Sequence, residues 1–235
     1  MRNYFTLNGV NSTTYGVYIS GQGTFNAPGR DYNLIPVPGR NGDLIGPEKR
    51  LQNGTLTYPA FIYTNFKQNI EDFRNFLLSL VGYVDLVDTY HPGEIRKVCF
   101  TGPFDADVES KNDAGKFDIT FTCKPQRYLA SGQSVTTLTA NGSITNPTRF
   151  DSQPLLRVWG TGQLGIGSQT VTITQADVYT DIDCEMMDAF KGTANKNPYV
   201  QLTDHNFPVF KPGVNNISLG TGITKVEITP RWWIT

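Results

Sequence analysis

The sequence predicts a mainly β protein with a single α-helix, arranged as two domains. Glycine and proline supply 23 and 14 of the 235 residues, and they divide the chain into short segments bounded by turns. Several of these segments alternate apolar and polar side chains with a period of two, which is typical of strands with one buried face. Only one segment has the three- and four-residue spacing of an amphipathic helix.

The composition excludes several classes of protein. At roughly 150 residues per domain, the length fits one large or two small domains. The net charge is −1, from 20 basic and 21 acidic residues, whereas nucleic-acid binders normally carry a basic excess. The longest apolar run, residues 76–81, is too short to cross a bilayer, and no apolar stretch of signal-peptide length follows the N-terminus. We therefore expect a soluble protein with no membrane insertion and no specific binding of nucleic acid.

The clearest strand lies at residues 116–123, where every second side chain is apolar. The apolar members are Phe117, Ile119, Phe121 and Cys123. Residues 170–174 and 225–229 repeat the pattern, which indicates antiparallel strands with one buried and one solvated face. Pro92-Gly93 and Asn141-Gly142 lie between such runs and are typical of turns.

The predicted helix extends from Asn65 to Val81. Its apolar residues recur every third or fourth position and are expected to pack into the core; they are Phe66, Ile70, Phe73, Leu77 and Leu80. Thr64 or Asn65 is expected to cap the start of the helix, and Gly82 to close its end.

A domain boundary is predicted near residue 130, which gives domains at residues 1–130 and 131–235. Residues 130–134 are small and polar, as in a linker, and they follow the strongly alternating strand. The first domain carries the helix. The second contains only strand-like runs separated by frequent turns, which is typical of a β-sandwich.

Neither a metal nor a cofactor is expected. Cys99, Cys123 and Cys184 are odd in number and widely spaced, which indicates free thiols rather than disulfides or a zinc site. Residues 181–185 begin like a calcium loop, but Met186 and Gly192 stand where that loop needs glycine and glutamate. A solvated acidic strand edge is the expectation there.

Residues 160–165 read Gly-Thr-Gly-Gln-Leu-Gly and match the dinucleotide pattern G-x-G-x-x-G. That pattern needs a helix next, whereas the residues that follow are typical of a turn and a strand. We therefore interpret the glycines as a hairpin connection. His91 and His205 are the only histidines; His91 precedes Pro92-Gly93 and is expected on an exposed turn. Since no nucleophile motif or P-loop occurs, the protein is not expected to be an enzyme.

Three groups of residues are more specific than the composition. The first is residues 32–35 followed by Val-Pro-Gly-Arg-Asn-Gly-Asp-Leu at 37–44. The second is the helix, then residues 83–88, residues 90–96 and Phe-Thr-Cys-Lys-Pro at 121–125. The third is residues 207–215 with Ile-Thr-Pro-Arg-Trp-Trp at 228–233. In order and spacing, over nearly the whole chain, they resemble the distal tail (Dit) proteins of siphovirus-type bacteriophages, which are tail-tip or baseplate hubs.

The resemblance implies a β-sandwich-like ring-building domain with one helix, followed by a galectin-like β-sandwich. It also implies a virion structural protein, assembled in the host bacterial cytoplasm, whose six copies form a ring at the tail tip. The implied partners are other copies of the chain, the tail tube protein, the tail-associated hub or lysin and, in some relatives, receptor-binding or other baseplate proteins. Some relatives insert a long arm in the sandwich; residues 179–199 are the only candidate here, so a dedicated arm is not expected.

The segment at residues 29–54 is the candidate contact between copies. It is rich in proline and glycine and has too few apolar residues to build a core, so it would gain order by lying against a neighbour. The expected apolar anchors are Leu34, Ile35, Leu44 and Ile45, with Arg40 as a polar contact. Two alternatives stay open: Arg40 as a plain surface charge, and a monomer in which the segment is a surface loop.

The C-terminal Trp232-Trp233 is expected to place one ring in the core and the other at the surface, because neighbouring residues of a strand face opposite sides.

Two other functions are alternatives to a structural hub. A carbohydrate-binding module of a host-recognition device would use Tyr and Trp rings to stack on sugars, but the sequence lacks a galectin-type sugar-contact strand. A hydrolase of cell-wall polymer would need a carboxylate pair, and the sequence singles out none.

Overall fold

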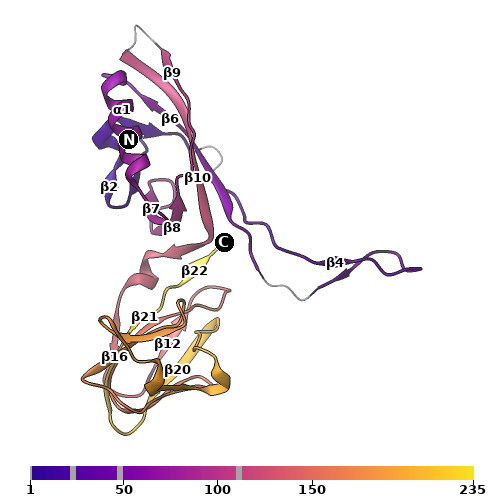
Figure 1. Ribbon diagram of the computed structural model, residues 1–235, viewed down its shortest axis with the longest axis vertical. Helices are drawn as coiled ribbons and strands as arrows, with labels where there is room; N and C mark the ends of the chain where they lie inside the picture. The colour runs from indigo at the N-terminus through magenta and orange to yellow at the C-terminus, as the bar shows by residue number, and fades with distance from the viewer. Residues whose placement is uncertain (1, 22–24, 47–49, 110–112) are drawn as a thin grey trace. The chain divides into compact units, whose positions relative to one another are not determined.

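A computed structural model describes residues 2–21, 25–46, 50–109 and 113–235 (Figure 1). The predicted fold class is confirmed: the chain is mainly β, with one α-helix among the described residues. Its internal contacts divide it into two units, Met1–Arg127 with Thr235, and Tyr128–Ile234. No helix of the described part is long and apolar enough to span a membrane.

The strands of the first unit form one sheet, apart from a separate hairpin. They are β1 (Phe5–Leu7), β2 (Val10–Asn11), β3 (Val17–Ile19), β6 (Gly54–Ile62), β7 (Val84–Asp88), β8 (Glu94–Cys99), β9 (Ala106–Glu109) and β10 (Ala114–Leu129, whose last residues belong to the second unit); the hairpin is β4 (Leu34–Ile35) and β5 (Leu44–Ile45), and the helices are η1 (Ser12–Tyr15) and α1 (Phe66–Ser79). The sheet order is β2-β1-β7-β8-β10-β6-β3, with β9 paired to β10. A bridge between Asn3, two residues before β1, and Ile19 in β3 curls the sheet towards a closed barrel.

The predicted alternation at residues 116–123 is confirmed in β10. Phe117, Ile119 and Phe121 are buried, and the residues between them are exposed. The strand pairs antiparallel with β6, so that Phe117 lies opposite Ala60 and Phe121 opposite Leu56. The inward side chains of both strands therefore enter the same core.

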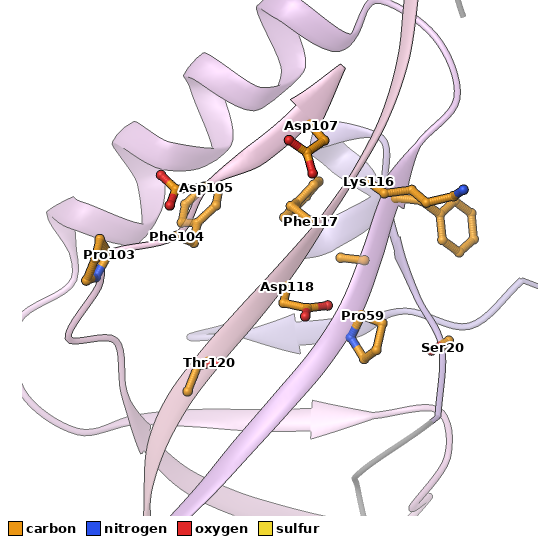
Figure 2. A pocket seen from close by; sticks show the side chains of 12 residues that line it. Ser20, Pro59, Pro103, Phe104, Asp105, Asp107, Lys116, Phe117, Asp118 and Thr120 are labelled. Carbon is orange, nitrogen blue, oxygen red and sulfur yellow. The ribbon is translucent and has the colours of Figure 1, made fainter. Parts of the chain in front are cut away.

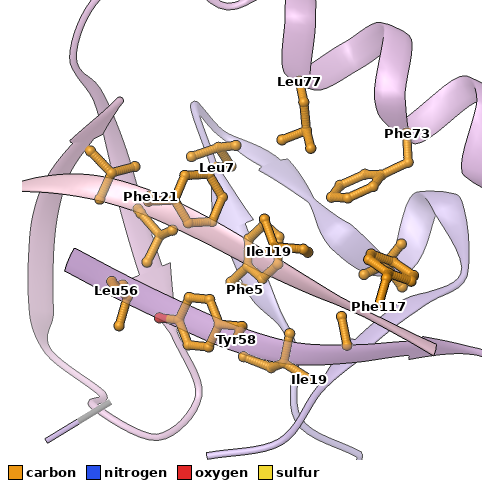
Figure 3. Packing of buried hydrophobic residues seen from close by; sticks show 14 of the residues in the cluster. Phe5, Leu7, Ile19, Leu56, Tyr58, Phe73, Leu77, Phe117, Ile119 and Phe121 are labelled. Carbon is orange, nitrogen blue, oxygen red and sulfur yellow. The ribbon is translucent and has the colours of Figure 1, made fainter. Parts of the chain in front are cut away.

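The core of the first unit is built largely from aromatic rings (Figure 3). Phe5 stacks on Tyr58 with 5.7 Å between ring centroids and meets Phe121 edge-on at 6.0 Å. Helix α1 adds Phe66, Phe73 and Leu77, which are almost fully buried. The predicted apolar stripe is thus confirmed as a core face.

Asn65 occupies the N-cap position of this helix as expected, but its side chain does not cap the helix, and Gly82 does not close the end. Asn65 precedes the helix but has a left-handed backbone (φ 52°) and makes no capping hydrogen bond with its side chain; instead its N–H donates to Asp113 Oδ1 at 2.8 Å. The helix ends at Ser79, and Leu80, already extended, takes the capping position ahead of Gly82.

The second unit has two sheets. One has the order β11 (Thr136–Leu138), β21 (Ile223–Thr229), β13 (Leu155–Gly160), β16 (Tyr179–Asp183), β17 (Asp188–Lys191), β18 (Ala194–Asn195); the other has the order β12 (Gly142–Asn146), β20 (Gly213–Leu219), β14 (Gly162–Ile166), β15 (Gln169–Ile173), β19 (Val200–Leu202). Short 3-10 turns η2 (Ala130–Gln133), η3 (Asn197–Tyr199) and η4 (Thr203–His205) and strand β22 (Trp233–Ile234) complete it. Buried residues of both sheets share one core, which makes the unit a β-sandwich. Residues 179–199 form β16, β17, β18 and η3 within this unit rather than an extended loop.

The glycine pattern at residues 160–165 is a crossing between the two sheets, not the predicted hairpin. Strand β13 pairs with β16 and β21, whereas β14 pairs with β15 and β20. Gly160 has φ 95°, and a Cβ added there would lie 2.0 Å from the carbonyl oxygen of Gly222. Glycine is needed at this position because the backbones of Gly160 and Gly222 are in contact. The residues that follow the pattern form strand β14, so no helix N-terminus is present there to hold a pyrophosphate.

We expect Gly160→Ala to lower the free energy of unfolding of the second unit by at least about 2 kcal/mol, because strain at positive φ adds to overpacking. Urea unfolding monitored by tryptophan fluorescence measures it, since Trp159, Trp232 and Trp233 all lie in this unit. The control is Gly167→Ala, which also has positive φ (59°) but open space around the new Cβ. Equal losses in the two variants would contradict the role of the backbone contact.

Two expectations about polar residues are wrong. His91 is buried rather than exposed, because the Asp88 carboxylate accepts its backbone N–H at 2.8 Å and also contacts its ring Nδ1 at 3.1 Å. Asp181 and Asp183 are buried rather than solvated: Arg157 and Arg231 each bind one of them with two hydrogen bonds. Within the described residues no group of acidic, histidine and cysteine side chains is arranged to hold a metal ion.

Two further expectations are confirmed. Cys99, Cys123 and Cys184 are free thiols. Trp232 is buried in the core, whereas Trp233 is only half-buried, stacking on Phe150 at 4.3 Å.

Candidate assembly surface

The structure brings the predicted apolar contact residues together. Strands β4 and β5 pair as an antiparallel hairpin in which Leu34 lies opposite Ile45 and Ile35 opposite Leu44. Because side chains alternate along a strand, one pair occupies each face of the hairpin. We call residues 29–52, described except for 47–49, the assembly arm.

These four side chains are exposed on the single chain. The exposed fractions are 56% for Leu34, 45% for Ile35, 45% for Leu44 and 64% for Ile45. An isolated two-stranded hairpin is marginal in water, and both of its edges present unpaired backbone groups. The arm thus has apolar contacts to offer and lacks a core of its own.

Backbone and side-chain hydrogen bonds hold the base of the arm together. The N–H of Gln52 donates to the carbonyl of Gly29 at 2.8 Å, and that of Asp31 to the carbonyl of Arg50 at 3.1 Å. The Asp31 carboxylate accepts hydrogen bonds from the side chains of Gln52 and Arg50, which hold its pKa below the ordinary value against a smaller effect of desolvation. The base is therefore a defined two-stranded stem.

The tip of the arm is a turn around Arg40. The N–H of Arg40 donates to the carbonyl of Val37 at 3.2 Å, and Gly39 and Gly42 take positive φ values of 77° and 81°. Arg40 is exposed, and its guanidinium makes no hydrogen bond or ion pair with any side chain in the described ranges. The tip therefore presents a guanidinium without a side-chain partner among the described residues, two positions after Pro38.

The length of the arm is enough to reach a neighbouring molecule. From Gly29 to Arg40 an extended strand covers about 35 Å, at roughly 3.3 Å per residue. That is comparable with the diameter of a small domain, roughly 30 Å.

The first unit also carries a groove that sequence reasoning missed. Its volume is about 670 Å³, and its lining includes side chains of β6, β9, β10 and the residues before β9 (Figure 2). Its side chains are spaced between residues 20 and 120, so no local pattern marks it; the only signal is that Pro59 and Phe61 occupy outward positions of β6, where polar residues are normal.

Part of the chain matches a known protein family. Residues 10–123 match the family model of the phage tail protein RIFT-related domain. This part of the chain is therefore similar to that phage tail family. The match includes the assembly arm and nearly all of the first unit. No curated protein has a matching sequence.

Solved structures extend the likeness to the whole chain. It superposes on the Dit (gp 19.1) protein of phage SPP1 with a TM-score of 0.76 and 15% identity, covering 100% of both chains; that protein is described as a paradigm of the hub adsorption apparatus in phages infecting Gram-positive bacteria. It also superposes on a chain of the phage P2 baseplate in its activated conformation with Ca, with a TM-score of 0.53 and 13% identity, covering 97% of both. The predicted resemblance to distal tail proteins is confirmed, and these structures share the fold of the chain.

Proposed function

We propose that this protein forms a closed cyclic homo-oligomer, a hexamer, at the tip of a siphophage tail. The ring would join the tail tube protein to the tail-associated hub or lysin, and receptor-binding or other baseplate proteins would attach around it. Its place is the virion, after assembly in the host cytoplasm. The proposal rests on one observation: an arm with four exposed aliphatic side chains on a unit similar to the phage tail family.

The arm makes a head-to-tail contact the natural mode of association. It would bind a surface of the next copy that is different from itself, and such heterologous contacts close into a ring when the rotation per subunit fits. Burial of the four aliphatic side chains contributes about 1.5 kcal/mol or more for each one fully covered. The resemblance to the Dit family supplies the six-fold number.

We propose the first unit, residues 1–130, as the ring-building domain and residues 131–235 as a galectin-like sandwich domain. The family match at residues 10–123 and the change of unit after Arg127 support this division. The family is one of structural tail proteins, and the proposed role needs neither catalysis nor a cofactor.

Removing the apolar contacts of the arm should make the ring dissociate into single chains. The variant Leu34→Ser, Ile35→Thr, Leu44→Ser, Ile45→Thr keeps the hairpin but removes its aliphatic surface. Light scattering should give about six times the 26.1 kDa chain mass for the wild type and the mass of one chain for the variant. The control replaces two other exposed aliphatic residues, Val81→Thr and Val214→Thr, whose exposed fractions are 91% and 68%, and should stay assembled.

A wild-type protein that remains monomeric at high concentration would contradict the ring. An arm variant that assembles as well as the wild type would show that the arm is not what joins the copies.

The carbohydrate-binding alternative receives less support. On the sheet of β13, β16 and β21, Trp159 and Tyr179 lie side by side, 5.7 Å apart. Lys225 Nζ stands 3.6 Å from the centroid of the Trp159 ring, and the Arg157 guanidinium 4.6 Å from that of Tyr179. Since the chain's own cations already cover these ring faces, stacking of a sugar there would have to displace them.

A further inference from the structure

The groove of the first unit is lined by both apolar and acidic side chains. Pro59, Phe61, Pro103 and Phe104 supply apolar surface, and Asp105, Asp107 and Asp118 supply three carboxylates (Figure 2). In the sheet Asp118 lies opposite Pro59, and Lys116 lies between Phe61 and Asp107. Carboxylates and proline and aromatic side chains are thus neighbours on one surface.

The carboxylates of this groove have no cationic partner in the part of the chain that the structure describes. The three carboxylates are exposed, and none makes a hydrogen bond or ion pair with a side chain of the described residues. The only cation in the lining, Lys116, is paired with Glu109 outside it at 3.1 Å. Several carboxylates in one concave surface create a negative potential, which favours binding of a cation from another molecule.

We infer that the groove receives the tip of the assembly arm from a second copy of this chain. Arg40 would lie among the three carboxylates, and Val37 and Pro38 would pack on Pro59 and Phe61. The inference rests on the proposed function, because it names the surface that the arm grips.

Three features of the tip fit the groove. Its guanidinium is exposed and unpaired, so a carboxylate partner completes its hydrogen bonding. Arginine also stacks on aromatic and planar surfaces better than lysine, and the groove offers them at Phe61 and Phe104. Prolines on both surfaces lose little conformational entropy on binding.

The chain's own arm does not fill the groove. Arg40 and Pro38 are exposed, Val37 is half-buried, and the groove carboxylates are exposed, so tip and groove are both open on one molecule. A second copy satisfies both at once, and repetition of the same contact generates a ring.

Charge reversal tests the contact in the full-length chain. Arg40→Glu and Asp118→Lys should each weaken association by about tenfold or more in sedimentation equilibrium at low salt, and the loss should shrink at high salt because screening weakens both proteins' charges. The double variant carries a reversed pair in every contact and should recover most of the lost affinity, which identifies direct coupling.

Two matched variants serve as controls. Asp43→Asn removes the tip's own carboxylate and should not weaken association. Asp151→Lys reverses an exposed carboxylate of the second unit and should leave association unchanged. Thermal melting of each variant checks that the fold is retained.

The outcomes separate this inference from the proposed function. If the aliphatic arm variant dissociates but Asp118→Lys does not weaken association, or the double variant is no better than additive, the arm binds elsewhere and the inference is overturned. If Asp118→Lys leaves the ring intact but abolishes binding of another tail protein, the groove serves that partner instead, and the inference is likewise overturned. If the arm variant itself stays assembled, the proposed function fails as well.

Discussion

Replacing Phe73 by alanine should lower the free energy of unfolding of the first unit by about 3–5 kcal/mol, as for other fully buried phenylalanines. Phe73 is 0% exposed and projects from helix α1 toward the buried cluster of Figure 3. Its ring lies 5.7 Å from that of Tyr15, 6.2 Å from that of Phe117 and 6.3 Å from that of Phe5. These rings come from η1, β10 and β1, so the cavity left by alanine has rigid walls and collapses poorly.

Urea unfolding followed by near-ultraviolet circular dichroism of the tyrosines measures this effect, because all three tryptophans lie in the second unit. The control is Leu78→Ala on the same helix, where the side chain is 65% exposed and the expected change is within about 0.5 kcal/mol. A Phe73→Ala loss no larger than the control's would mean that the helix is not part of the core.

Replacing Arg231 by methionine should destabilise the second unit by about 3 kcal/mol, because it leaves the Asp183 carboxylate buried without its cation. Arg231 Nη1 and Nη2 donate to the two oxygens of Asp183 at 2.7 and 2.8 Å, and the Asp183 side chain is 7% exposed. The backbone N–H groups of Glu185 and Met186 also donate to that carboxylate at 3.0 Å, which keeps the loss from being larger.

The effect of this substitution should depend on pH. Burial raises the pKa of Asp183, but the Arg231 guanidinium and the two backbone N–H groups outweigh it and hold the pKa below the ordinary 3.8. A carboxyl whose pKa is lowered in the folded state contributes stability above the unfolded pKa and loses it as pH falls through the folded one. The gap in stability between wild type and Arg231→Met should therefore be full at neutral pH and shrink below about pH 4.

Urea titrations across this pH range, followed by tryptophan fluorescence, give the gap directly. Arg149→Met is the control, since Arg149 is exposed and should behave like the wild type at every pH. A gap that persists unchanged at the lowest pH would show that Arg231 stabilises the sandwich by packing rather than by its charge.

The elements that can be predicted from the amino-acid pattern are those in which the spacing of apolar side chains matches their burial. The two-residue alternation of residues 116–123 decides which face of β10 is buried, because successive side chains of a strand point to opposite sides. The spacing of Phe66, Phe73 and Leu77 places them on one helix face in the same way. The exposed arm also agrees with the composition of residues 29–54, which hold too few apolar groups to build a core.

Features that depend on contacts between distant parts of the chain could not be predicted and are seen only in the folded structure. His91 is buried because Asp88 folds the turn inward, and Asp183 is buried because Arg231 reaches it from 48 positions further along the chain. The glycine at 160 is explained by the backbone of Gly222 in another strand, not by the motif around it. The acidic groove gathers side chains from four separate segments. No local pattern encodes such meetings, because burial of a polar group is favourable only where its partner has been brought by the rest of the fold.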